Sequence, residues 1–167
     1  MQTAFSLGSN LGDRLRHLIQ AKTLLLLDST VTFVSQSPVY ETEPVDVRPE
    51  YQSMKFLNAV LLVESSYSAE EWLRKIKKIE SMLQRVRSED RNAPRTIDID
   101  VLFCGDQVVD SDCLQIPHPR WMKRLFVVQP LSDVCPDLVV PGEKRPVRQI
   151  LEHWPEREGL QNFAKQW

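Results

Sequence analysis

The sequence contains little glycine and little cysteine, and both shortages narrow the range of functions. Only five of the 167 residues are glycine, and neither a GxxxxGKS/T nor a GxGxxG pattern occurs. The first pattern forms the phosphate-binding loop of P-loop proteins, and the second forms that of Rossmann-type sites. Both types of site are therefore excluded. The three cysteines, Cys104, Cys113 and Cys135, form no CxxC pair, and there are only three histidines. Neither a disulfide framework nor a zinc site is therefore expected.

Long apolar runs and a strong net charge are also missing. No run approaches the roughly 20 apolar residues that span a bilayer, and the N-terminus MQTAFSLGSN lacks a signal-peptide pattern. The net charge is −2 and the sequence pI is about 5.9, which argues against a general nucleic-acid binder. We expect a reduced, cytoplasmic protein without membrane or nucleic-acid partners.

The pattern of apolar residues divides the chain into strands and helices. The expected strands are Thr3–Leu7, Val31–Tyr40, Phe56–Val63, Thr96–Phe103 and a segment around Phe126–Gln129; the expected helices run from the SLGSNLGDR turn to about Asp28, from Ser68 to about Gln84, and over Val147–His153. Ser9 or Asn10 is the expected cap of the first helix, and Ser68 with Glu71 has the spacing of a capping box. The order β-α-β-β-α-β plus a C-terminal extension predicts a single domain over residues 1–167. Its expected fold is a ferredoxin-like α+β sandwich, with helices on one face of a mainly antiparallel sheet.

Two acidic residues alternate with apolar ones in the segment PRTIDIDV. In a strand, Asp98 and Asp100 share one face, while Ile97, Ile99 and Val101 share the other. Carboxylates with backbones about 6.5–7 Å apart can converge on Mg²⁺, which is commonly held by one or two carboxylates plus substrate phosphates. A solvated edge strand is the alternative, but aspartate is depleted in strands. The pattern therefore favours a metal site.

Four arginines fall within eleven residues shortly before the acidic pair, namely Arg85, Arg87, Arg91 and Arg95. Arg95 lies only three residues before Asp98, so its guanidinium group is expected near the metal site. Guanidinium groups suit phosphate oxygens, and together with Mg²⁺ they stabilise a transferring phosphoryl group. Any one of these arginines could be a solvated loop charge. As a set, they indicate a compact anionic ligand.

Three other residues leave two interpretations open. His118 lies between prolines in IPHPRW and is either structural or ligand-contacting. Asn58 interrupts the apolar strand FLNAVLLV, and its amide needs partners from a heterocycle or from the main chain. Phe126 is either a core residue or a platform for a ligand.

Several of these segments occur together in the order and spacing of a known enzyme family. They are SLGSNLGDR, SPVYETEP, FLNAV, the IE–RVR run, PRTIDIDVLF, IPHP and RLFVVQPL, from Ser6 to about Pro136. In this set the chain resembles the 6-hydroxymethyl-7,8-dihydropterin pyrophosphokinases of folate synthesis. The resemblance implies a ferredoxin-like α+β fold. It also implies transfer of the β,γ-pyrophosphate of ATP to the hydroxymethyl group of the pterin, with release of AMP.

The resemblance further implies roles for individual residues. Asp98 and Asp100 would hold two Mg²⁺ ions at the ATP phosphates, and Arg85 and Arg95 would engage the phosphates and assist transfer. The implied ATP-binding residues are Glu80, Arg87, His118 and Arg124, and the implied pterin-binding residues are Thr42, Val45, Phe56, Asn58 and Phe126, with Phe126 stacked on the ring. The expected partners are small molecules only, ATP and the pterin.

Two positions depart from the family pattern. Gln84 stands where the family usually has glycine before the first arginine of the RxR pair. Asn92 stands in the loop before PR, where many bacterial members have tryptophan. Neither departure removes a metal ligand or a transfer arginine, so an active enzyme is expected.

Two rival functions are less well supported. A phosphatase of the haloacid dehalogenase type also uses DxD after a strand, but it usually has a DxDxT pattern, whereas this chain continues with Val101 and Leu102. An RNA-binding ferredoxin-like domain usually presents exposed aromatic residues for base stacking. The strands FLNAVLLV and TIDIDVLF lack that signature.

Overall fold

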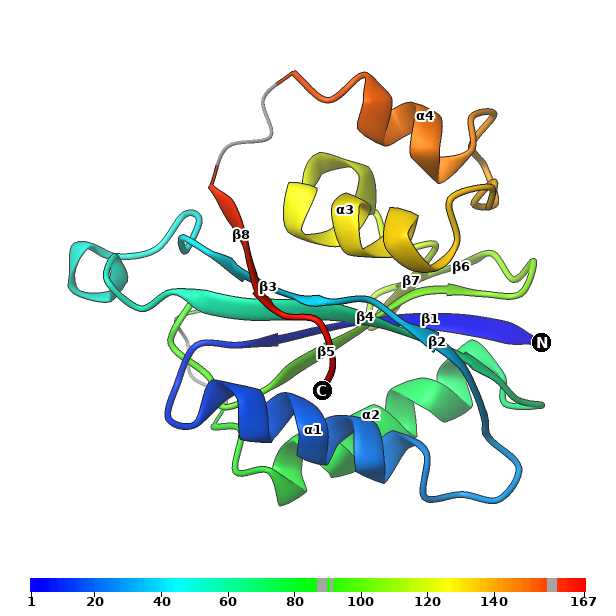
Figure 1. The fold of residues 1–167 in the computed structure, drawn as a ribbon. Helices are drawn as coiled ribbons and strands as arrows, with labels where there is room; N and C mark the ends of the chain where they lie inside the picture. The colour runs from blue at the N-terminus through cyan, green and yellow to red at the C-terminus, as the bar shows by residue number, and fades with distance from the viewer. Residues whose placement is uncertain (87–89, 91, 156–158) are drawn as a thin grey trace.

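One six-stranded sheet runs through the molecule and carries helices on both of its faces (Figure 1). The structure is a computed structural model that describes residues 1–86, 90, 92–155 and 159–167. The strands are β1 (Gln2–Ser9), β2 (Thr32–Gln36), β3 (Val39–Thr42), β4 (Phe56–Glu64), β5 (Asp98–Cys104), β6 (Val109–Ser111), β7 (Leu114–Ile116) and β8 (Leu160–Ala164). The α-helices are α1 (Arg14–Leu25), α2 (Ala69–Met82), α3 (Leu125–Val134) and α4 (Val147–Glu152), and short 3₁₀ helices cover Pro49–Tyr51 and Trp121–Lys123.

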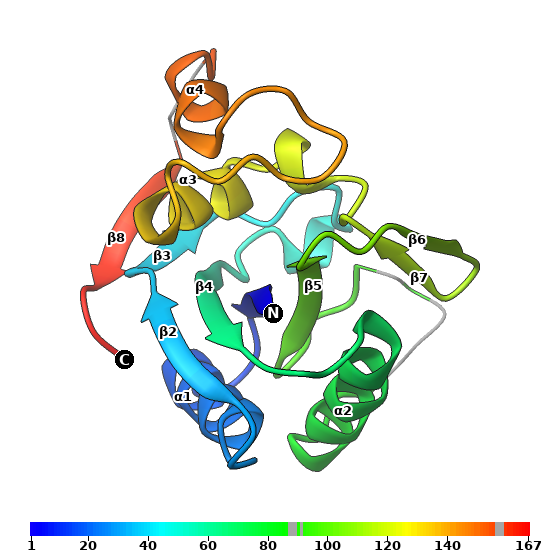
Figure 2. The same cartoon turned by 90° about the vertical axis from the view of Figure 1, so that its right-hand side faces the viewer.

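Strand β4 lies inside the sheet and organises its pairing. It pairs with β1 along one edge and with β2 and then β3 along the other, in each case antiparallel. Strand β5 pairs antiparallel with β1, and β8 pairs antiparallel with β3. The hairpin β6–β7 forms a separate small sheet beside β5 (Figure 2). The predicted α+β class and the predicted antiparallel sheet are confirmed.

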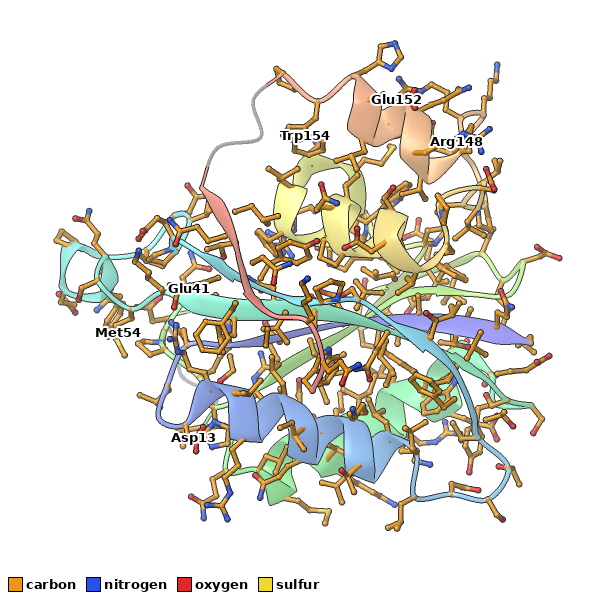
Figure 3. All side chains as sticks on the ribbon, viewed as in Figure 1. Asp13, Glu41, Met54, Arg148, Glu152 and Trp154 are labelled. Atoms are coloured by element: carbon orange, nitrogen blue, oxygen red, sulfur yellow. The ribbon has the colours of Figure 1, made fainter. Side chains whose placement is uncertain are left out.

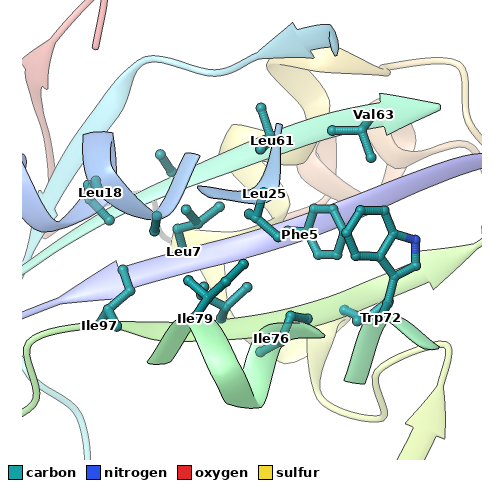
Figure 4. Close-up of a cluster of buried hydrophobic side chains, with 14 of the residues drawn as sticks. Phe5, Leu7, Leu18, Leu25, Leu61, Val63, Trp72, Ile76, Ile79 and Ile97 are labelled. Atoms are coloured by element: carbon teal, nitrogen blue, oxygen red, sulfur yellow. The ribbon is translucent and has the colours of Figure 1, made fainter. Parts of the chain in front are cut away.

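Two hydrophobic clusters lie on opposite faces of the sheet. Helices α1 and α2 cover one face, where Phe5, Leu7, Trp72 and Ile76 are buried together (Figure 4). Helix α3 covers the other face, helix α4 packs on α3, and the two helices close a second cluster, which includes Leu131. Each fully buried side chain of this size contributes about 1.5–3 kcal/mol to folding. In the described part of the chain, no helix has the length and apolar content needed to cross a membrane.

The segment Phe126–Gln129, predicted as a strand, lies in helix α3 instead. Val127, Val128 and Leu131 are buried on this helix, and they pack in the second cluster against the sheet. Valine favours strands by its intrinsic preference, but burial of a continuous apolar face outweighs that preference here. The strand prediction is wrong, and the prediction of helices on only one face is wrong for the same reason.

The predicted strand Val31–Tyr40 is divided into β2 and β3. Pro38 lies between them and has no backbone N–H to donate to a neighbouring strand. Ser37 makes the contacts with β4 at this point: its N–H donates to the Val60 carbonyl at 2.9 Å, and its hydroxyl accepts from the Val60 N–H at 2.9 Å. Strand β8 was not predicted at all.

Helix α1 begins later than predicted and is capped by another residue. Asp13 is the N-cap, and its side chain accepts a hydrogen bond from the Arg16 N–H at 3.1 Å. Gly12 has a φ of +67°, a left-handed conformation that keeps the chain out of the helix before Asp13. The prediction of Ser9 or Asn10 as the cap is therefore wrong.

The N-terminus of helix α2 has the predicted capping box. The Ser68 hydroxyl accepts from the Glu71 N–H at 3.3 Å, and the Glu71 carboxylate accepts from the Ser68 N–H at 2.8 Å. Two backbone donors that lack partners within the helix are thereby satisfied.

The C-terminus of helix α2 closes in a Schellman motif at Gln84. The Gln84 N–H donates to the Ser81 carbonyl at 3.1 Å, and the Arg85 N–H donates to the Glu80 carbonyl at 2.9 Å. Gln84 has a φ of +60°, which explains why glycine suits this position. The motif turns the chain so that Arg85 lies back against Glu80.

Replacing Ser68 by alanine should lower the free energy of unfolding by about 1 kcal/mol, because the N-cap acceptor is lost. Chemical denaturation monitored by circular dichroism measures this change. Ser66→Ala is the matched control, since Ser66 is an exposed serine two residues earlier. Equal effects of the two substitutions would contradict the assigned cap.

Replacing Gln84 by glycine should raise the free energy of unfolding by about 0.5–1 kcal/mol. The left-handed conformation costs a non-glycine residue about 1–2 kcal/mol, and the extra freedom of glycine in the unfolded chain offsets part of this. Gln84→Ala keeps the Cβ atom and is the control, with an expected change near zero. A gain of the same size for alanine would show that the conformation of residue 84 is not the cause.

Candidate active site

The two acidic residues project from one face of β5, as the alternation predicted. Asp98 and Asp100 are half-buried, whereas Ile99 and Val101 are buried on the opposite face. The next residue on the acidic face, Leu102, belongs to the hydrophobic cluster beneath α3 and α4. The acidic pair therefore borders the second cluster directly.

Asp98 lies between two arginines. Its Oδ1 is 2.6 Å from Nη1 of Arg85, and its Oδ2 is 3.2 Å from Nε of Arg95. Arg85 also pairs with Glu80, which is 3% exposed and accepts a hydrogen bond from the Ile99 N–H at 3.1 Å. Burial alone would lower the pKa of Arg85, but the charges of Asp98 and Glu80 raise it. This cluster holds Arg85 protonated beside the acidic pair.

Asp100 is less well compensated than Asp98. Its nearest cationic group is Arg124, with Nη1 at 3.9 Å from Oδ2. The Asp100 side chain keeps 41% of its surface exposed. The surrounding protein nevertheless removes part of the hydration of its carboxylate. This desolvation, followed by the charge of Asp98, raises the pKa of Asp100 to about 6. A further cation at this position would stabilise the ionised pair.

His118 reaches the same carboxylate as a neutral ring. The backbone N–H of His118 donates to the Leu102 carbonyl at 2.9 Å. This bond fixes the His118 backbone beside β5. Its Nδ1 accepts from the Arg120 N–H at 3.1 Å, so the ring proton lies on Nε2, 3.8 Å from Asp100. Burial and then the charges of Arg124 and Arg120 lower the pKa of His118 to about 4.

Two arginines connect the acidic pair to aromatic rings. The Cζ atom of Arg95 lies 5.4 Å from the centroid of the Phe56 ring. The Cζ atom of Arg124 lies 5.5 Å from the centroid of the Phe126 ring. Both distances suit cation–π contacts. Each guanidinium group thus contacts one ring and faces one carboxylate, so the rings and the acidic pair form one site.

A buried amide lies two strands away from Asp98. Asn58 donates from Nδ2 to the hydroxyl of Thr42 at 2.8 Å, and the two residues are 4% and 8% exposed. Asn58 pairs across the sheet with Gly8, and Gly8 pairs with Asp98. A Cβ atom on Gly8 would lie 3.2 Å from Oδ1 of Asn58. The absence of a side chain at Gly8 therefore leaves room for the Asn58 carboxamide on this face of the sheet.

One described residue of the predicted site, Val45, takes no part in these contacts. Val45 lies in the loop after β3 and is 63% exposed. Arg87, predicted to bind ATP, lies outside the described residues, as does Arg91. Asn92, which replaces a loop tryptophan, donates from Nδ2 to the Asp46 carbonyl at 2.6 Å. It therefore links the segment before β5 to the loop that carries Val45.

One residue of the site was missed from the sequence. Asn10, interpreted there as a helix cap, is 4% exposed and accepts a hydrogen bond from the Arg95 N–H at 2.8 Å. The available signal was an amide at the end of an apolar strand, because a buried amide needs specific partners.

The acidic pair fits a magnesium ion shared with a substrate. Mg²⁺ takes oxygen ligands and is commonly held by one or two carboxylates plus phosphate oxygens. Desolvation and then the charge of Asp98 raise the pKa of Asp100, so a cation bound beside the pair would favour the ionised form of this carboxyl group. Within residues 1–86, 90, 92–155 and 159–167, no group of three or more His, Cys, Asp or Glu side chains forms a metal site. The protein would therefore supply part of the coordination, and substrate or water the rest.

Comparisons with known proteins show the family to which the chain belongs. A family model described as 7,8-dihydro-6-hydroxymethylpterin-pyrophosphokinase (HPPK) matches residues 4–136. The 2-amino-4-hydroxy-6-hydroxymethyldihydropteridine pyrophosphokinase of Bacillus subtilis (strain 168) is 35% identical over 160 residues, which cover 95% of this chain and 93% of that protein. A protein of the same name from Aquifex aeolicus (strain VF5) is 34% identical over 144 residues, or 86% of each chain.

The fold also occurs in a solved structure, the wild-type HPPK-DHPS of Plasmodium falciparum with pteroate. The TM-score is 0.71 at 14% identity, and the match covers 96% of this chain and 47% of that chain. At this identity the likeness concerns the fold alone, and the chain spans less than half of the Plasmodium protein. The relatives from the two bacteria confirm the predicted resemblance and the predicted class of enzyme, a pyrophosphokinase of folate synthesis. The chain belongs to the 7,8-dihydro-6-hydroxymethylpterin-pyrophosphokinase family.

Proposed function

We propose that the protein transfers the β,γ-pyrophosphate of ATP to the hydroxymethyl group of 6-hydroxymethyl-7,8-dihydropterin and releases AMP. The observation that carries this proposal is the joint site on β5. Asp98 and Asp100 face guanidinium groups that also contact Phe56 and Phe126. This arrangement would accommodate phosphate groups and a flat ring side by side.

The pterin would bind where the buried amide meets the two rings. Asn58 and Thr42 are hydrogen-bonded to each other, and their polar groups suit the donors and acceptors along the edge of a pterin. Phe126 and Phe56 supply faces for stacking, which is worth about 0.5–1.5 kcal/mol beyond burial. The roles of these four residues and of Val45 remain predictions.

Asp98 and Asp100 would hold magnesium ions at the phosphates of ATP, and two ions are expected. Bound Mg²⁺ would neutralise charge on the phosphates and so favour their approach to the acidic pair. The support for this assignment is the shared face of the two carboxylates and the raised pKa of Asp100.

Arg85 and Arg95 would stabilise the transferring group. Both guanidinium groups lie within 3.2 Å of Asp98, so they can exchange the carboxylate for phosphate oxygens as the pyrophosphoryl group is transferred. The alcohol oxygen forms a bond to the β-phosphorus, the bond from that phosphorus to the α-phosphate oxygen breaks, and the proton of the alcohol passes to water. No covalent enzyme intermediate is needed, because positioning and charge neutralisation provide most of the catalysis in phosphoryl transfer.

Arg124 and His118 would contribute to ATP binding from the other side of Asp100. Both approach its carboxylate to within 3.9 Å, and the neutral His118 ring presents an Nε2–H donor there. The predicted ATP contact of Glu80 stays a prediction. Its own contacts give it a second role, since its buried carboxylate holds Arg85 in place.

The finer description of the fold belongs to the same proposal. The sheet order β5-β1-β4-β3, with α1 after β1 and α2 after β4, supports a ferredoxin-like arrangement in one domain over residues 1–167. The same sheet carries both hydrophobic clusters.

A cytoplasmic location stays a prediction. An RNA-binding role is not favoured, because α3, with α4 packed on it, covers the sheet face that such domains use for bases (Figure 2).

Asp98→Asn should lower the rate of AMP formation by about 100-fold or more, because the carboxylate charge that would hold Mg²⁺ is lost. The assay contains ATP, Mg²⁺ and reduced hydroxymethylpterin, and AMP is measured by chromatography. Asp106→Asn is the matched control, since Asp106 is exposed just beyond the end of β5. The proposed function is wrong if the unaltered protein forms no AMP above background, and the role of Asp98 is wrong if Asp98→Asn keeps full activity.

Arg95→Ala should lower kcat by about 100- to 1,000-fold, while the KM for ATP changes by less than about threefold. The reason is that Arg95 is assigned to the transition state rather than to ground-state binding. Steady-state kinetics at varied ATP concentration separate the two parameters. Arg74→Ala, which removes an exposed arginine in the middle of α2, is the control. Parallel losses in kcat and in ATP affinity would contradict this role.

A further inference from the structure

Asn10 makes three hydrogen bonds at the end of β1, and two of them hold the same residue. Its N–H donates to the Arg95 carbonyl at 3.2 Å, and its Oδ1 accepts from the Arg95 N–H at 2.8 Å. Both backbone groups of Arg95 are therefore fixed by Asn10. The third bond runs from Nδ2 to the Met54 carbonyl at 3.4 Å.

The position of Arg95 in the chain explains why it needs such a contact. Pairing between β1 and β5 ends at Gly8 and Asp98, so Arg95 lies three residues outside the regular ladder. Beyond that end, the Asn10 side chain provides the acceptor that a strand neighbour would otherwise provide. The direction of the Arg95 side chain therefore depends on Asn10.

The bond to Met54 extends this contact to the pterin side of the site. Met54 lies beyond the end of the sheet, near Glu41 (Figure 3), and two residues before Phe56, which begins β4. The Phe56 ring contacts the Arg95 guanidinium group. One buried carboxamide thus links the segment that precedes Phe56 to the backbone of Arg95.

We infer that Asn10 is a positioning residue for pyrophosphoryl transfer, because its carboxamide sets Arg95 against both Asp98 and the aromatic side of the site. The inference rests on the proposed function, through the role of Arg95. Asn10 touches neither the acidic pair nor the rings in the contacts described above. It acts through Arg95, and its loss is expected to misplace the guanidinium group rather than to remove it.

The test is a double-mutant cycle between Asn10→Ala and Arg95→Ala. Asn10→Ala alone should lower kcat by about 10- to 100-fold, the size of loss that a displacement of about 1 Å can cause, with the KM for ATP changed by less than about threefold. In the Arg95→Ala background the same substitution should lower kcat by less than about threefold, because the group that it positions is already absent. Multiplicative losses in the double variant would overturn the inference.

A purely structural role is separated by a control in the same turn. Asp13→Ala removes the N-cap of α1, three residues from Asn10, without touching Arg95. It should lower the melting temperature while kcat at 25 °C stays within about twofold of the unaltered protein. A loss of kcat in Asp13→Ala as large as that in Asn10→Ala would show that any weakening of this turn slows the reaction, and the inference would fail.

Folding and function are distinguished in the same experiment. If Asn10→Ala does not fold, Asn10→Ser replaces it in the cycle, since serine is too short to reach the Arg95 N–H and leaves a smaller gap. The same expectations and the same contrary outcome apply to it. Absence of AMP formation by the unaltered protein would defeat the proposed function. If Arg95→Ala lowers activity but the losses of the two substitutions multiply in the double variant, only the role of Asn10 would be defeated.

Discussion

Asp98 and Asp100 carry two negative charges on one face of a strand, and the cations that balance them come from three different segments of the chain. Arg85 follows α2, Arg95 precedes β5, and Arg124 precedes α3. Exposed ion pairs are worth about 0–1 kcal/mol, whereas breaking a fully buried pair costs about 3–5 kcal/mol. The side chains paired at Asp98 are 17–24% exposed and lie between these limits. These ion pairs are strong enough to order the arginines, and they are weak enough for phosphate oxygens to replace the Asp98 carboxylate.

The acidic face of β5 is held in place because the strand is shared between both hydrophobic clusters. Ile99 and Val101 are buried against α1 and α2, and Leu102 is buried beneath α3. A register shift of one residue would move Asp98 and Asp100 into the first cluster and expose the apolar residues. The cost of burying two unpaired carboxylates far exceeds that of ordinary packing defects. The direction of the metal-binding side chains is therefore fixed by the core rather than by the site itself.

Local patterns allowed much of the site to be predicted, and non-local contacts explain the errors. The alternation at Asp98 and Asp100 is a property of one strand, so the sequence alone indicated their shared face. The helix that contains Phe126–Gln129 depends on burial against a sheet formed elsewhere in the chain, and the valines alone indicated a strand. Asn10 resembles a helix cap until Arg95, far along the sequence, supplies its partner. Strand β8 likewise becomes recognisable only through its pairing with β3.

The end of α2 shows how a local conformational cost contributes to the arrangement of charges. Gln84 adopts a left-handed conformation that glycine would adopt more easily, yet the Schellman hydrogen bonds of Gln84 and Arg85 are both formed. The cost of about 1–2 kcal/mol is offset by those bonds and by the pairing of Arg85 with Glu80 and Asp98. The backbone motif, rather than the identity of residue 84, brings Arg85 to the acidic pair. The departure from the family's usual glycine therefore lowers the stability of the helix end without displacing the cation that the site requires.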